Sequence, residues 1–439
     1  MAELTLMKNA AEQQLAAEWQ KAKDALPGAA PLRAAAFERF ASVGLPHRRV
    51  EEWKYTDLRA LMRDAKPLAV PPDAAAKAGA KDAGAVVGDI DARRLTFVDG
   101  AFVPELSDLK DLSAGLTIRP LAQSLAQNDA LVARYLGKVI ATDDPVVALN
   151  TSFMGDGAVI HVAAGAVVER PLHLVFAASG EKPAALFTRS LVVIEKGARV
   201  MLIESHEGAA GRDYQVNTAL EMVVADNAHV DHIKITREGE KALHLSSLMA
   251  DVGAHARFNT FLFTIGAGIV RNQLFLRFGG EGTLANIRGA TLLKGREHVD
   301  TTMLVDHAAV GCQSREVFKT VLDDRARGVF QGKIIVRPGA QKTDAKMAAH
   351  SLMLSEDAET DNKPELEIYA DDVQCGHGAT AGDLDEDLLF YLKARGIPHH
   401  EAEALLIQAF VGDAIEGIED AGLREALIEA VGAWVKTRG

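Results

Sequence analysis

The chain has 439 residues, of which 48% are hydrophobic and 25% are charged, and its formal net charge is -13. A chain of this length and apolar content can bury two or three cores, which excludes a disordered protein. The acidic balance, without any Lys/Arg-rich run, argues against binding to nucleic acid or to an anionic membrane.

The sequence contains no targeting, membrane-spanning or disulfide signal. Its first residues, MAELTLMKNAAEQQ, lack the charged and apolar regions of an export signal, and no apolar run is long enough to cross a bilayer. The two cysteines, Cys312 and Cys375, lie far apart and form no CxxC pair, so no disulfide framework is expected. We therefore expect a cytoplasmic protein with free thiols.

Residues 1–64 are predicted to form an N-terminal helical region that ends in LPHRRVEEWKYTDL, a segment dense in charged and aromatic residues. Residues 65–145 are predicted to be a linker and connecting segment, because residues 65–85 are rich in Ala, Pro and Lys and poor in large apolar side chains. The helical region has two apolar stripes, formed by Leu15, Ala16 and Trp19 and by Leu32, Ala36, Phe37 and Phe40.

Residues 146–382 are predicted to form the β core, since short runs of β-branched and apolar residues with a period of two are separated there by Gly, Asp and Asn. A phrase recurs at first about every thirty residues, as is typical of stacked coils: VAAGAVV at 162, IEKGARV at 194, VADNAHV at 224 and ADVGAHARF at 250, then VRPGAQ at 336. Each unit is interpreted as a strand, a corner that tolerates a left-handed backbone, and another strand. The pattern favours a parallel β-helix, although a β-sandwich also has many short strands and turns.

Residues 383–439 are predicted to form a C-terminal helical domain. Each of its three predicted helices carries a stripe of apolar residues. Apolar stripes usually pack internally, but three helices alone cannot bury all their apolar surface, so the remainder is expected to cap the solenoid or to dock a partner helix. The three stripes are Leu384, Leu388, Tyr391 and Leu392; Ala402, Leu405, Leu406, Ala409 and Phe410; and Leu423, Ala426, Leu427, Ala430, Val431 and Trp434.

Two apparent motifs are rejected on spacing. The run from Gly328 to Ile334 resembles a phosphate-binding loop, but it is one residue too short and lacks the Ser or Thr that binds magnesium, so ATP hydrolysis is not expected. His229 and His232 resemble a pair of metal ligands, but three residues apart on a strand they point to opposite faces.

Cys375 and His377 form the strongest candidate for chemistry. Two residues apart on a strand, they project to the same side, where they can hold a soft metal, or the histidine can lower the pKa of the thiol. Two ligands are too few for an iron-sulfur cluster or a structural zinc, so the missing ligands would have to come from another chain. The other interpretation is a buried cysteine beside an ordinary histidine.

Residues 330–397 resemble the shared core of the SufB/SufD family of iron-sulfur cluster assembly proteins. The motifs AQKTDA, Pro-x-Leu-Glu-Ile, ADDVQCGHGAT and LFYLKARGI stand in the order found in the family. HRRVEEWKYTDL, residues 47–58, and the HGAT motif are similar to the SufD members.

The resemblance implies a mainly β fold with α ends, in which a right-handed parallel β-helix is flanked by helical regions. It implies a non-catalytic subunit of a cytoplasmic complex with SufB and SufC, with the ATPase activity in SufC. His377 falls on the functional histidine of the family, which implies a metal ligand of a transient iron-sulfur cluster shared with SufB; Cys375 is the less certain member of the site. The residues implied to bind SufC are Leu405, Leu406, Ala409 and Phe410.

Further interpretations stay open. The chain could be a purely structural scaffold for SufB and SufC that contributes no cluster ligand. A carbohydrate-active β-helix enzyme would want an export signal, an exposed carboxylate pair and aromatic platforms, none of which is visible. Reduced flavin is associated with some complexes of this family, but the sequence has no flavin fingerprint. An isolated chain could also form a homodimer through exposed strand edges.

Overall fold

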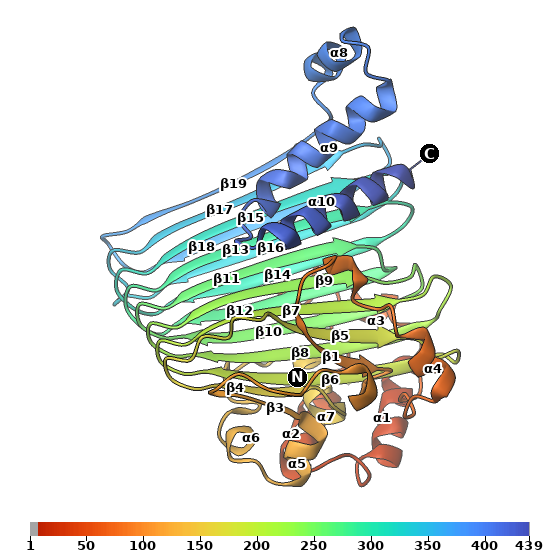
Figure 1. The fold of residues 1–439 in the computed structure, drawn as a ribbon, viewed down its shortest axis with the longest axis vertical. Helices are drawn as coiled ribbons and strands as arrows, with labels where there is room; N and C mark the ends of the chain where they lie inside the picture. The colour runs from red at the N-terminus through yellow and green to blue at the C-terminus, as the bar shows by residue number, and fades with distance from the viewer. Residues whose placement is uncertain (1–7, 439) are drawn as a thin grey trace, which may run out of the picture.

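The core of the protein is a parallel β-solenoid of about 8 turns, with helices at both ends. The computed structural model describes residues 8–438. The odd-numbered sheet consists of odd-numbered strands and, at its N-terminal edge, β2, in the order β19-β17-β15-β13-β11-β9-β7-β5-β1-β2 (Figure 1). The even-numbered sheet consists of even-numbered strands and, at its N-terminal edge, β3, in the order β18-β16-β14-β12-β10-β8-β6-β4-β3. Each turn of the solenoid thus gives one strand to each sheet, which confirms the predicted parallel β-helix with α ends and excludes the β-sandwich.

The strands are β1 (Arg93–Val98), β2 (Ala101–Phe102), β3 (Leu116–Pro120), β4 (Ala158–Val162), β5 (Leu172–Ala178), β6 (Ala184–Ile194), β7 (Arg199–Gly208), β8 (Tyr214–Val224), β9 (His229–Arg237), β10 (Leu243–Val252), β11 (Arg257–Ile265), β12 (Ile269–Phe278), β13 (Leu284–Leu293), β14 (His298–His307), β15 (Gln313–Leu322), β16 (Arg327–Val336), β17 (Asp344–Met353), β18 (Glu359–Ile368) and β19 (Gln374–Gly382). The helices are α1 (Ala10–Ala22), α2 (Ala30–Val43), η1 (Glu51–Trp53), α3 (Leu58–Leu61), α4 (Ala74–Gly79), η2 (Ala85–Val87), η3 (Pro104–Leu106), α5 (Leu121–Ala126), α6 (Ala130–Tyr135), α7 (Pro145–Phe153), α8 (Glu386–Ala394), α9 (His399–Ile415) and α10 (Ala421–Lys436).

The corners of the solenoid explain the recurring phrase in the sequence. Gly165, Gly197 and Asn227 have φ angles of 69°, 69° and 57°, in the left-handed region that the phrase predicts. Their N–H groups donate to carbonyl oxygens of the next corner at 2.8–2.9 Å, so the corners stack like the strands. In ADVGAHARF the left-handed residue is His255, with a φ angle of 55°, and after VRPGAQ it is the next residue, Lys342, with a φ angle of 62°; the glycines of these two phrases are not left-handed.

The N-terminal end of the solenoid is covered by helices. α1, α2 and α7 lie against this end (Figure 1), and the stacked rings of Trp19 and Phe37, with centroids 4.8 Å apart, join their buried cluster. Residues 65–145, predicted as a linker from composition, contain α4, η2, β1, β2, η3, β3, α5 and α6, and β1 pairs in parallel with β5. The division into domains at residues 64, 145 and 382 stays a prediction.

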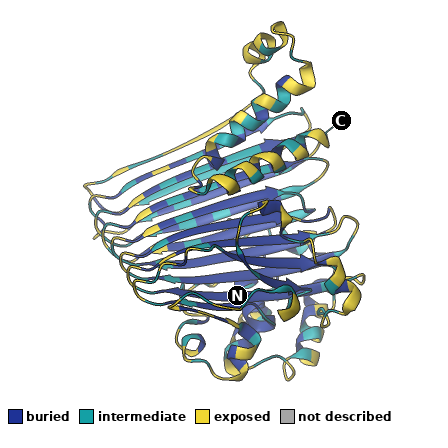
Figure 2. Cartoon of the chain, in the orientation of Figure 1, coloured by how far each residue is buried: buried dark blue, intermediate teal, exposed yellow. Residues whose placement is uncertain are grey.

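The C-terminal helices differ in how far they are buried. α9 and α10 pack against the outer face of the odd-numbered sheet, where Ile407, Val411 and Leu427 share a buried cluster with Ile233 and Phe263. α8 projects beyond the last coil and has no buried residue (Figure 2). No helix among residues 8–438 is long and apolar enough to cross a membrane.

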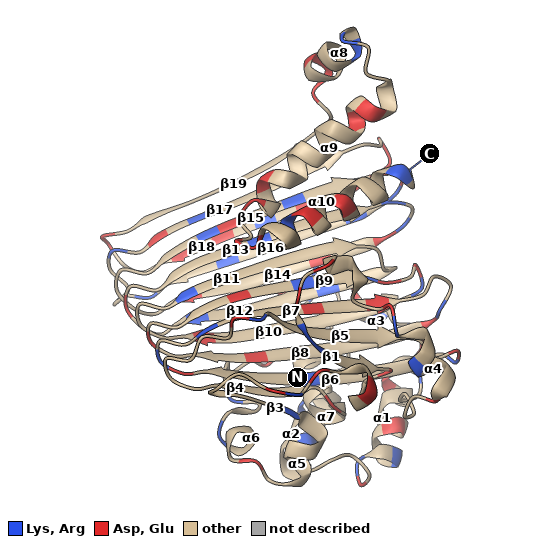
Figure 3. Cartoon of the chain, in the orientation of Figure 1, with Lys and Arg blue, Asp and Glu red and all other residues tan. Residues whose placement is uncertain are grey.

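Charged side chains of both signs are spread over the strands and helices (Figure 3). Several pair across neighbouring coils, as Arg327 does with Asp361 at 2.7 Å and Lys333 with Glu367 at 3.1 Å. Because these pairs are partly exposed, each contributes little to stability.

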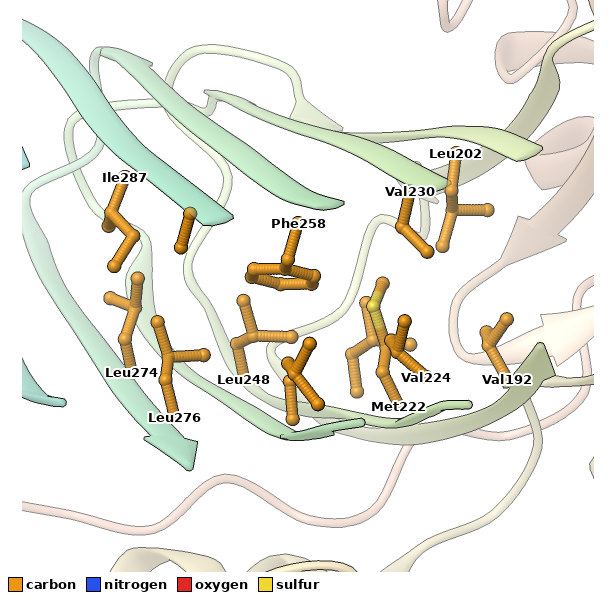
Figure 4. Packing of buried hydrophobic residues seen from close by; sticks show 14 of the residues in the cluster. Val192, Leu202, Met222, Val224, Val230, Leu248, Phe258, Leu274, Leu276 and Ile287 are labelled. Atoms are coloured by element: carbon orange, nitrogen blue, oxygen red, sulfur yellow. The ribbon is translucent and has the colours of Figure 1, made fainter. Parts of the chain in front are cut away.

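The space between the two sheets is filled mainly by aliphatic side chains and phenylalanines. Figure 4 shows side chains of both sheets, such as Val230 and Phe258 from one and Met222 and Leu248 from the other, pointing toward one another. The interior also holds polar residues: His232 contacts Glu204 at 3.0 Å and Thr260 at 2.9 Å, whereas His229 lies on the outer face of β9 near Glu419. This confirms that His229 and His232 point to opposite faces.

Candidate functional site

The last coil of the β-helix is its open end. Within residues 8–438, β18 and β19 are the terminal strands of their sheets and pair on one side only, with β16 and β17. The N–H of Gln374 donates to the carbonyl of Thr343 at 2.8 Å, so the backbone groups of even-numbered residues of β19 face β17 and those of odd-numbered residues face the free edge. Such an edge can add a strand from another chain.

Cys375 and His377 lie on this terminal strand, and their side chains project to the same side, as predicted. Cys375 is the Cα partner of Ala345, and His377 that of Met347. Ala345 and Met347 belong to the cluster between the two sheets, so both side chains point toward the interior of the solenoid at its mouth. Cys375 is half-buried against this cluster, whereas His377 is exposed.

The surroundings of Cys375 in this chain favour its protonated form. Burial raises the pKa of Cys375, and the nearby carboxylates of Asp344 and Glu316 raise it further, against the effect of a hydrogen bond from the backbone of Ala345. This is the reverse of the lowering that a neighbouring histidinium would cause. The direction of this shift favours the protonated thiol, and a role of Cys375 as an activated nucleophile stays a prediction.

A buried carboxyl, that of Glu316, lies two coils inward from His377, with Met347 between them. Glu316 of β15 is the Cα partner of Met347 of β17, which in turn is the Cα partner of His377 of β19. The side chain of Glu316 is fully buried. Neither carboxyl oxygen of Glu316 has a hydrogen-bond partner, and burial raises the pKa of this group to about 7. Farther along β15, the hydroxyl of Ser314 lies 3.0 Å from Nε2 of His307. Glu316 could not be predicted from the sequence, because its position relative to His377 depends on the register of strands two coils apart.

The two sheets pack closely against each other just inside the open end of the β-helix. A Cβ atom on Gly332 would overlap with the Met347 sulfur and lie 2.9 Å from the Phe330 ring, so a larger residue at this position would have to displace these side chains. The run from Gly328 to Ile334 lies within β16, and it is therefore a strand and not a phosphate-binding loop.

The four residues predicted to bind SufC lie in different environments on α9. Leu405 and Ala409 are exposed, whereas Leu406 and Phe410 are half-buried, with Nζ of Lys319 4.7 Å from the centre of the Phe410 ring. α8 carries further exposed apolar side chains, of which Phe390, exposed by 72%, was missed by the sequence analysis. Of the stripe predicted here, Leu388 and Tyr391 are exposed, whereas Leu392 is half-buried and Leu384 packs against the cluster shared by α9, α10 and the β-helix.

Comparisons with known proteins match nearly the whole chain. The model of the SufBD core domain of the SUF system for FeS cluster assembly matches residues 176–410, and that of the SufBD protein N-terminal region matches residues 13–174. The chain is 33% identical to an iron-sulfur cluster assembly SufBD family protein of Synechocystis sp., over 91% of this chain and 89% of the relative.

Two relatives carry the name iron-sulfur cluster assembly protein SufD. The one from Escherichia coli is 30% identical, over 90% of each chain. The one from Bacillus subtilis is 26% identical, over 75% of this chain and 76% of the relative. The chain therefore belongs to the SufBD family of iron-sulfur cluster assembly proteins and is a homologue of SufD.

Proposed function

We propose that this chain is the SufD subunit of a cytoplasmic SufBCD complex and forms, with SufB, the interface where a nascent iron-sulfur cluster is built. The observation that carries the proposal is the position of His377, exposed on the unpaired terminal strand of the β-helix. A strand of SufB that pairs with this edge would bring its own side chains next to His377. The same edge is available to a second copy of the chain when SufB is absent.

The chemistry of the site fits an incomplete set of cluster ligands. A neutral imidazole binds iron, and an exposed histidine can reach a ligand on another chain without rearrangement of the β-helix. Cys375 is a thiol in the isolated chain, and it would bind iron only with release of its proton. A cluster needs about four ligands, so SufB would supply those that Cys375 and His377 do not.

The C-terminal helices suit a role in transmitting movement. Leu405 and Ala409 of α9, with the exposed apolar side chains of α8, form the surface where we place SufC, the subunit in which we expect the ATPase activity. The inner face of α9 is fixed to the β-helix through Ile407 and Val411. A movement of SufC on ATP binding would therefore move α9 and the β-helix together as one rigid body. This movement would change the contact between the β-helix and SufB.

The two surfaces can be tested in one experiment, in which the chain is co-expressed with SufB and SufC and each variant serves as control for the other. Ala379→Pro removes an N–H that faces the free edge of β19, and we expect it to abolish co-purification of SufB but not of SufC. Leu405→Asp places a charge on the exposed face of α9 and should release SufC but retain SufB. The proposed surfaces would be contradicted if both variants still co-purified with SufB and SufC. This comparison requires that both variants keep the melting temperature of the parent chain.

A further inference from the structure

Three potential metal ligands meet where the C-terminal helices contact the outer face of the β-helix, far along the chain from Cys375 and His377. His229 and Asp231 lie two residues apart on β9, so both side chains are on the face that α9 and α10 cover. Glu419 lies in the connection between α9 and α10. One nitrogen or oxygen atom of each residue lies within 4.8 Å of the corresponding atoms of the other two.

The distances are close to those of an occupied site. Nε2 of His229 is 3.3 Å from Oδ2 of Asp231 and 4.0 Å from Oε1 of Glu419. Tetrahedral ligands about 2.0–2.1 Å from a zinc ion lie about 3.3 Å from one another. The first pair already has this separation, and the half-exposed side chain of Glu419 would have to move closer to both His229 and Asp231.

Neighbouring side chains orient the two carboxylates. Nδ2 of Asn259 donates to Oδ1 of Asp231 at 2.8 Å, and Nδ2 of Asn286 donates to Oδ1 of Asn259 at 2.9 Å. Arg199 donates to Oε2 of Glu419 at 3.2 Å. The other oxygen of each carboxylate is left facing His229, as in metal sites, where outer residues hold the ligands in place.

The imidazole of His229 joins the two carboxylates. Its Nε2 atom is buried and lies at ion-pair distance from both, at 3.3 Å from Asp231 and 4.0 Å from Glu419. A metal ion at this point would replace these ion pairs by direct coordination of the three side chains. Asp231 and Glu419, but not His229, also line a cavity of about 20 Å³, which has room for a single water molecule beside the two carboxylates.

We propose that His229, Asp231 and Glu419 bind one divalent transition-metal ion, with zinc preferred, that fastens the α9–α10 connection to the β-helix. One imidazole and two carboxylates favour zinc over calcium or magnesium, which bind almost entirely through oxygen. Arg199 and Arg257 flank His229 on the neighbouring strands and keep the negative charge of the site small. The ion would therefore stabilise the helices that present Leu405, without a part in cluster chemistry.

The test uses the full chain without an affinity tag, in a Cys375→Ser/His377→Ala background that removes the other candidate ligands. After treatment with a chelator, zinc binding is measured by calorimetry and the ligand geometry by the absorption spectrum of bound Co²⁺. We expect one zinc ion per chain, loss of binding in His229→Gln, and an affinity at least about tenfold lower in Glu419→Gln. His161→Gln is the matched control, because His161 lies 3.3 Å from a single carboxylate, that of Glu195.

Two results would overturn the proposal: no zinc binding by the background chain, or unchanged binding in His229→Gln and Glu419→Gln. Either would leave the cluster as an ordinary polar contact between the helices and the β-helix. The melting temperature of each chelator-treated variant checks the fold. If His229→Gln is destabilised, Glu419→Gln decides the question, because residue 419 lies in an exposed connection.

Discussion

Asp300→Ala is expected to lower the free energy of unfolding by about 3–5 kcal/mol. The side chains of Asp300 and Arg271 are both 0% exposed and form an ion pair. Thr56 also donates to Asp300 from the N-terminal segment that covers this face of the β-helix. Without the carboxylate, the Arg271 guanidinium would stay buried with only the Glu52 carbonyl at 2.7 Å and the Trp53 ring at 4.3 Å as partners.

Unfolding in urea measures this loss, and Asp361→Ala is the matched control. Asp361 pairs with Arg327 at 2.7 Å on a neighbouring coil, but both side chains are partly exposed, so its removal should cost less than about 1 kcal/mol. Equal losses for the two variants would contradict the role given to the buried pair. Replacing both partners, as in Arg271→Met/Asp300→Leu, should recover most of the stability, because no buried charge is then left unpaired.

Glu316→Gln is expected to stabilise the chain by about 3 kcal/mol at pH 8 and by less than about 1 kcal/mol at pH 5. Burial raises the pKa of this carboxyl from 4.5 to about 7 in the folded chain. The folded chain therefore binds the proton more tightly than the unfolded chain does. Its stability falls as the pH rises from about 4.5 to about 7, and the loss is complete above that range. Glutamine keeps the shape of the neutral carboxyl and avoids this loss.

The measurement is the free energy of unfolding of the parent chain and Glu316→Gln at both pH values. Glu356→Gln, at an exposed corner, controls for the removal of one acidic group. The same difference between parent and Glu316→Gln at pH 5 and pH 8 would show that Glu316 is ionised in the folded chain, contrary to its burial.

The β-helix could be predicted from the sequence because its signals are local. The alternation of apolar residues and the glycine or asparagine at corners such as Gly197 and Asn227 repeat with each turn. His255 and Lys342 gave no such signal, since their left-handed backbone is imposed from the next coil: their N–H groups donate at 2.7 Å to the carbonyl oxygens of Glu281 and Asp372.

The candidate site was predicted in part for the same reason. Strand alternation alone places Cys375 and His377 on one side, but Glu316 reaches the site only through the pairing of β15, β17 and β19. Burial in the assembled coil also determines the pKa of Cys375, so the spacing of the pair could not give its direction. The contact of Glu419 with His229 likewise depends on the docking of α9 and α10 on the β-helix.

The most direct test of the proposed function is the iron and acid-labile sulfide content of the complex co-purified with SufB and SufC. His377→Ala should leave the complex assembled but lower its cluster content at least about tenfold. His350→Ala is the matched control: His350 lies on the neighbouring strand β17, on the opposite face, with Nδ1 2.7 Å from Thr380, and should not change the cluster content. An unchanged cluster content in His377→Ala would contradict the ligand role and make this chain a scaffold for SufB and SufC alone.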